Sequence, residues 1–164
     1  MTPPLKHTLT SLNLIYFALI IVMVGFATFV YAQIASGEET PEHNAELETL
    51  LQYIVLAVVP AGMGIGYIAF KAALKGITPD MSLAEKLQRY QSAVIIRGAG
   101  FEMPGMLASA AAFITGNIYF LLFTAVVVVL FLLFRPTLNA VTNDLQLTAT
   151  ERAELESNHP FTRR

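Results

Sequence analysis

Four residues in one apolar stretch are the strongest candidates for chemistry. The stretch "IIRGAGFEMPGM", at 95–106, contains Arg97, Gly100, Glu102 and Pro104. If hydrocarbon begins near Gln91, a helical rise of about 1.5 Å per residue places Arg97 about 9 Å deep and Glu102 about 17 Å deep, near the midplane of a bilayer. An ionisable residue at that depth must face protein or water, so these residues mark a candidate polar site inside the membrane.

The two charges are not expected to pair with each other. Residues five apart on a helix point about 140° apart, so the sequence predicts no salt bridge between Arg97 and Glu102. Arg97 is shallow enough to snorkel to the headgroups. Glu102 has two interpretations: a structural carboxyl that ties helices together, or a carboxylate that carries a proton or cation.

Pro104 is expected to disturb the helix around Glu102. Its ring removes a backbone donor and clashes with the carbonyl of Gly100, which favours a kink or local unwinding just before it. A freed Gly100 carbonyl would add a second polar group beside Glu102, and the spot must then face protein or water.

Small residues suggest how this segment packs. Four of them share the face of Glu102 at helical spacing: Gly98, Gly105, Ser109 and Ala112. The preceding apolar run contains Gly62 and Gly66, a small-xxx-small pair. Because such faces allow helices to approach closely, we expect the two segments to pack together through them, with the Ser109 hydroxyl free to bond across the interface.

Composition defines the elements that position these residues. The chain has 164 residues, 55% of them hydrophobic and 13% charged. Three runs carry no charge: 24 residues at 12–35, 22 at 49–70 and 32 at 103–134. Each run exceeds the roughly 18 to 20 residues that a helix needs to cross a bilayer. A cleavable signal peptide at the first run is disfavoured because its apolar core is longer than about 15 residues.

The predicted fold class is an all-α, integral membrane four-helix bundle. One transmembrane domain at 1–135 holds spans at about 11–35, 50–74, 82–115 and 118–134, and 136–164 form a short cytoplasmic tail. Ser11 and Ser82 are the expected helix caps, with turns at "TPD" (78–80) and "TGN" (115–117).

The basic residues predict the orientation. Outside the spans nine of them are found: Lys6, Lys71, Lys75, Lys86, Arg89, Arg135, Arg152, Arg163 and Arg164. The first loop, "SGEETPEHNAELE", instead has five glutamates and no lysine or arginine. All nine fall on one side if both termini are cytoplasmic, as the positive-inside rule requires.

The tail has two interpretations. "TATE", at 148–151, has the spacing of a capping box and could begin a short helix carrying Leu155, lying on the surface or against a partner. A frayed polar tail is the interpretation we favour, because the segment is short and polar.

Several functional classes find no support. The chain has no cysteine, and His7, His43 and His159 lie far apart in sequence, so no metal site or cofactor is predicted. The net charge of −2 provides no basic field for nucleic acid. No nucleophile motif or pair of carboxylates within the membrane indicates a catalytic residue, and we expect no enzyme.

The motifs, taken in order along the chain, resemble those of a known group of proteins. The succession of "IIRGAGFEMPG", "TGN", "RPT" and "DLQLTATE" resembles a group of uncharacterised small four-span inner-membrane proteins of the Bacteroidota. The likeness covers nearly the whole chain and implies an architecture rather than a mechanism.

A second resemblance is to the c subunit of rotary ATP synthases. A glycine-rich span with "AGMGIG", a basic loop and a span with one carboxylate, Glu102, are similar in outline to its hairpin. This chain departs from that pattern in its extra spans, in lacking Arg-Gln-Pro in the loop, and in having Pro104 two residues after the carboxylate.

Three functions are therefore open. The first is a non-enzymatic membrane protein that forms a homo-oligomer or serves as an accessory subunit of a larger membrane complex. The second is a c-like subunit that translocates protons or cations on Glu102, with Arg97 modulating its charge. The third is a subunit of a small-molecule transporter.

Overall fold

The computed structural model describes residues 5–37 and 44–157, and this part of the chain is all α-helical, as predicted. The helices are α1 (Leu5–Ser36), α2 (Ala45–Leu74), α3 (Leu83–Thr115), α4 (Phe120–Leu133), α5 (Leu138–Leu145) and α6 (Ala149–Ser157). The predicted loop at 38–43 and the end of the tail, with His43, His159, Arg163 and Arg164, lie outside the described residues.

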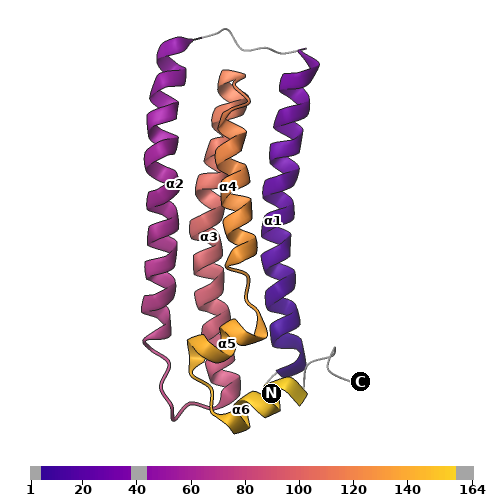
Figure 1. The fold of residues 1–164 in the computed structure, drawn as a ribbon, viewed down its shortest axis with the longest axis vertical. Coiled ribbons are helices and arrows are strands. Elements are labelled where there is room, and N and C mark those ends of the chain that lie inside the picture. Colours follow the sequence, from indigo (N-terminus) through magenta and orange to yellow (C-terminus); the bar gives the residue numbers. More distant parts are fainter. Residues whose placement is uncertain (1–4, 38–43, 158–164) are drawn as a thin grey trace.

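The helix α3 is the central element of the bundle. It packs most extensively on α2 and also on α1 and α4 (Figure 1). The short helices α5 and α6 lie at the end of the bundle where the α2–α3 loop and the start of α1 are also found (Figure 1). We call this the basic end, because the described basic residues other than Arg97 belong to segments that lie at it or next to it.

Most helix ends follow from local side-chain chemistry. Ser82 caps α3 in a reciprocal capping box with Glu85, and Asn44 caps α2 by accepting a hydrogen bond from the Leu47 amide. Gly116 ends α3 in the left-handed region, with φ of 67°, which glycine adopts without steric penalty. The predicted cap at Ser11 is wrong, because α1 is helical from Leu5 and Ser11 lies inside it.

Two helices are long and apolar enough to cross a membrane, namely α1 over Ser11–Ser36 and α2 over Ala45–Leu74. The helix α3 does not have this property, since glycine, proline and charged residues dilute its apolar content. The helix α4 has 14 residues and reaches the required length only together with α5, to which it is bent by 73°.

Aromatic side chains fill the space between α3 and its neighbours. Phe131 of α4 lies 4.9 Å from Tyr16 of α1 and 5.7 Å from Phe101 of α3, measured between ring centroids. Phe70 of α2 meets Tyr90 of α3 edge to face at 5.9 Å. These contacts fix the rotation of α3, which determines where its polar residues point.

Candidate functional site

The helices α2 and α3 meet through glycines from both sides. A Cβ atom built on Gly100 would lie 2.6 Å from the Gly66 Cα and 3.3 Å from the Gly62 carbonyl oxygen. In return, a Cβ on Gly62 would lie 3.2 Å from the Gly100 carbonyl oxygen. Backbones this close leave room only for hydrogen, and the geometry is that of Cα–H···O contacts between helices. Gly62 and Gly66 thus face α3, but the residue they meet is Gly100.

The other small residues of α3 face a different pair of helices. A Cβ on Gly98 would lie 3.1 Å from Leu19 of α1, and one on Gly105 would collide with Met23 of α1. The Ser109 and Thr124 hydroxyls are 2.9 Å apart, and Thr124 also donates to the Gly105 carbonyl at 3.0 Å. Ser109 therefore bonds across to α4. The expectation that this face meets α2 is wrong.

Helical geometry explains why Gly100, and not the face of Glu102, meets α2. Gly100 is two residues from both Gly98 and Glu102, which places it about 200° away from each around the helix. The helix α3 therefore has two small-residue faces, and the aromatic contacts turn the Gly100 face toward α2.

Glu102 is half-buried midway along α3. Because Gly100 and Pro104 face α2, helical geometry places Glu102 on the side away from α2. Among residues 5–37 and 44–157, no hydrogen bond or ion pair reaches its carboxylate. Its expected partner, the glycine face of α2, lies on the opposite side of the helix. The adjacent residue Met103 is 74% exposed, so Glu102 lies at the margin of an outer surface of the bundle.

Pro104 is accommodated without a break in the helix. The helix α3 is continuous from Leu83 to Thr115, so the expected local unwinding is absent. The proline ring packs where Gly62 has no side chain, since a Cβ there would lie 3.1 Å from the Pro104 Cγ. The Gly100 carbonyl, which Pro104 deprives of its helical donor, lies against Gly62 in the same contact.

Arg97 is an interior residue. Its exposed fraction is 4%, and Nη2 donates to the Phe134 carbonyl at 2.6 Å. The guanidinium also lies 4.2 Å from the centroid of the Phe70 ring. The expected snorkelling to the headgroups is therefore wrong: the carbonyls that end α4 need donors, and Arg97 supplies one from within the bundle.

The Arg97→Lys substitution is expected to loosen the α4–α5 connection. Lysine keeps the charge but has no planar group to stack on Phe70 while bonding to Phe134, so we expect about 1 to 3 kcal/mol lower free energy of unfolding. Denaturation in detergent and hydrogen exchange at 134–137 measure this. The matched control is Arg89→Lys, because Arg89 donates to the Gly76 carbonyl from an exposed position. Equal effects of the two variants would contradict the role of Arg97.

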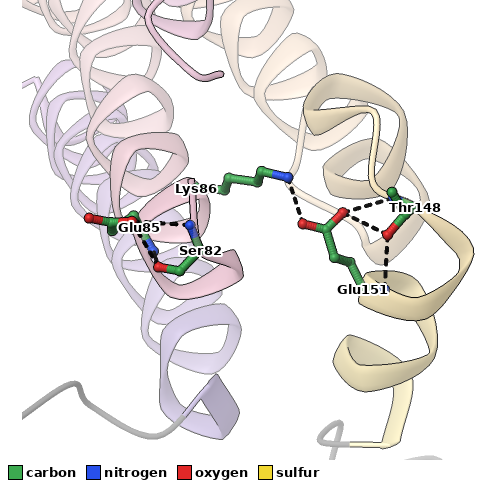
Figure 2. Close-up of polar contacts among 5 residues, drawn as sticks. All are labelled: Ser82, Glu85, Lys86, Thr148 and Glu151. Carbon is green, nitrogen blue, oxygen red and sulfur yellow. Dashed lines mark hydrogen bonds and ion pairs between the residues drawn. The ribbon is translucent and has the colours of Figure 1, made fainter. Parts of the chain in front are cut away.

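At the basic end, α6 is tied to α3 by an ion pair. Glu151 of α6 bonds to Lys86 of α3 at 2.5 Å and also accepts hydrogen bonds from the Thr148 amide and hydroxyl, each at 2.9 Å (Figure 2). Thr148 and Glu151 form the capping box that begins α6, and Leu155 is buried at 1% exposure. The interpretation of this segment as a frayed tail is wrong, because the capping box and Lys86 dock it on the bundle.

The charges at this contact make it strong. The Lys86 side chain is 6% exposed and the Glu151 side chain 19%, so little water screens the attraction between them. The pKa of Glu151 is lowered below its usual value, chiefly because Lys86 donates a hydrogen bond to its carboxylate and, to a smaller extent, because Thr148 does so too. A second ion pair, 3.1 Å between Lys71 and Asp144, ties α5 to α2, and Tyr90 donates to Asp144 at 3.3 Å.

The sequence did not predict these two ion pairs, Lys86–Glu151 and Lys71–Asp144, at the basic end. Lys71 and Lys75 at helical spacing signal a basic face on α2, but nothing in the sequence indicates that Asp144 and Glu151 return to it. The pairing depends on the turns between α4, α5 and α6, which apolar patterning does not determine.

The fold and these sites define an all-α protein with two helices able to cross a membrane and, within the described residues, a partner-free carboxyl on its central helix. No family model, curated protein or solved structure matches the chain. Within the described ranges, no three histidine, aspartate or glutamate side chains are grouped to hold a metal ion.

Proposed function

We propose that the chain is a non-enzymatic, multi-pass protein of a bacterial inner membrane, with four membrane-embedded helices and cytoplasmic termini. The apolar spans of α1 and α2 support membrane insertion. Orientation is supported by the basic end, since lysine and arginine are retained on the cytoplasmic side. The proposal treats α3 as a span shielded by its neighbours and α4–α5 as a bent one.

Within this placement, the protein serves as a binding subunit, either in a homo-oligomer or in a larger membrane complex. The observation that carries the proposal is the Glu102 carboxyl, half-buried midway along α3 without a partner among the described residues. A carboxyl at that depth is costly to expose to lipid, so a polar group of another helix is the expected partner. The internal glycine faces are already occupied by α2, α1 and α4, which leaves the surface around Glu102 and Met103 for this contact.

A c-like subunit that translocates protons or cations on Glu102 is the second candidate. The same lack of a partner favours it, because a carrier carboxyl must exchange its ion rather than hold a fixed hydrogen bond. Arg97 gives it less support than the sequence suggested, since its guanidinium is engaged by Phe134 and Phe70.

Substitution of Glu102 separates these functions. For a binding subunit, Glu102→Gln is expected to be mild, because the amide still hydrogen-bonds, while Glu102→Leu weakens association about three- to twentyfold. The measurement is the species copurified in mild detergent and its stoichiometry. The control is Met103→Leu, which changes the adjacent exposed side chain without removing a polar group.

The outcomes differ clearly. Unchanged assembly of Glu102→Leu would contradict the binding function. Loss of carbodiimide labelling together with loss of ion transport in reconstituted Glu102→Gln, with assembly intact, would favour the carrier instead.

A further inference from the structure

A pocket of about 700 Å³ lies at the basic end. Its walls come from the last turn of α2, the α2–α3 loop, the first turn of α3, and the α5–α6 segment. The Lys86–Glu151 ion pair shown in Figure 2 forms part of the wall, so the docking of α6 helps to build the pocket.

The charged groups around this pocket leave one positive charge uncompensated. Five ionisable side chains line it: Lys71, Lys75, Lys86, Asp144 and Glu151. Asp144 neutralises Lys71, and Glu151 neutralises Lys86. Lys75 is exposed and forms no ion pair within the described part of the chain. Its ammonium is therefore available to an anion. Lys71, one helical turn away, can donate a further hydrogen bond, because its contact with Asp144 uses one of its three N–H groups.

Part of the remaining lining is apolar, and Thr78, Gln146 and Thr148 add polar groups to it. Leu74, Ile77 and Leu145 contribute to the pocket beside the lysines. A wall of this kind suits an anion that carries an apolar portion better than a fully hydrated one. The position agrees with this, because Lys75 directly follows the apolar span Ala45–Leu74.

We propose that this pocket binds a phosphate-bearing anion, specifically the headgroup of an anionic phospholipid, with Lys75 as its principal ligand. The proposal rests on the proposed membrane orientation, which places the basic end in the leaflet where anionic lipids are concentrated. The phosphate lies against Lys75 and Lys71, and the glycerol and upper acyl chain lie against the apolar wall.

The test uses the full chain in nanodiscs of phosphatidylcholine with a graded fraction of phosphatidylglycerol, and native mass spectrometry to count retained phosphatidylglycerol. The Lys75→Gln variant is expected to need about tenfold more phosphatidylglycerol for half-saturation, the effect of losing one charged hydrogen bond. The control, Arg135→Gln, removes one charge from an exposed residue outside the pocket and is expected to behave as the native chain.

Two results would overturn the proposal. Equal weakening by Lys75→Gln and Arg135→Gln would show a diffuse charge effect rather than a pocket. Inorganic phosphate that binds the chain in pure phosphatidylcholine nanodiscs, and that displaces phosphatidylglycerol from the mixed nanodiscs at equal concentration, would assign the site to a soluble anion. Resistance to alkaline extraction reports membrane insertion separately, so failure of lipid selectivity is distinguishable from failure of the membrane placement.

Discussion

The Gly100→Ala substitution is expected to force α2 away from α3 and to lower the free energy of unfolding by about 2 to 3 kcal/mol. The new methyl group would lie 2.6 Å from the Gly66 Cα, and backbone cannot rotate away as a side chain can. Reversible denaturation in mixed micelles, followed by circular dichroism, measures the loss. Gly66→Ala is expected to act in the same direction with a smaller effect, since its methyl would lie 3.1 Å from the Gly100 Cα.

A matched control lies on the neighbouring helix. A Cβ on Gly64 meets nothing within 4 Å, although Gly64 lies between the two packing glycines of α2. Alanine there removes the flexibility of glycine without a clash, so Gly64→Ala is expected to be neutral or to stabilise by about 0.5 to 1 kcal/mol. Equal losses at Gly64 and Gly100 would contradict the close-packing role of Gly100, because Gly64 has no close neighbour and the higher helix propensity of alanine would by itself stabilise both positions.

The Glu151→Gln substitution is expected to release α6 from the bundle. It leaves Lys86 buried without a counter-charge and should weaken docking by about 2 to 4 kcal/mol. Hydrogen exchange and limited proteolysis at 149–157 report this, with α1 to α4 remaining protected. The control is Glu85→Gln, which alters the corresponding capping box at Ser82 but removes no partner from a buried lysine (Figure 2).

The same contact is expected to open in acid. The pKa of Glu151 is lowered from the usual 4.5 in the folded protein, so its contribution to docking is fully present above that pH. The contribution is lost as the pH falls below 4.5 and through the lowered pKa, because the protonated carboxyl no longer neutralises Lys86. Protection of α6 that is unchanged down to about pH 3 would contradict this role of Glu151.

The sequence predicted the helical elements well because their signals are local. The helices α1 and α2 follow the first two uncharged runs, and the third run is divided between the end of α3 and α4. The start and end of α3 follow the expected cap at Ser82 and the expected turn at Gly116. The prediction at Ser11 failed because a serine can also lie inside a helix, and the helical pattern continues before it. Docking of α6 was underestimated because a capping box alone does not reveal the buried Lys86 that receives it.

The candidate site was predicted less completely, since it depends on the rotation of α3. Sequence spacing correctly separates Arg97 from Glu102, and it identifies small residues around the helix. It does not show which face meets α2, because both faces could accept a close neighbour. It also does not show that Phe134 returns to Arg97, a contact between residues 37 positions apart.

The shortness of α4 has a consequence for the surrounding lipid. Its 14 residues extend about 21 Å, whereas the apolar part of α1 beside it has 26 residues and extends about 39 Å. In the proposed bilayer, the α4 side of the protein is thinner than the hydrocarbon layer of about 30 Å. Lipids there must compress or be replaced by a protein neighbour, so hydrophobic mismatch would draw partner helices to the α4 side.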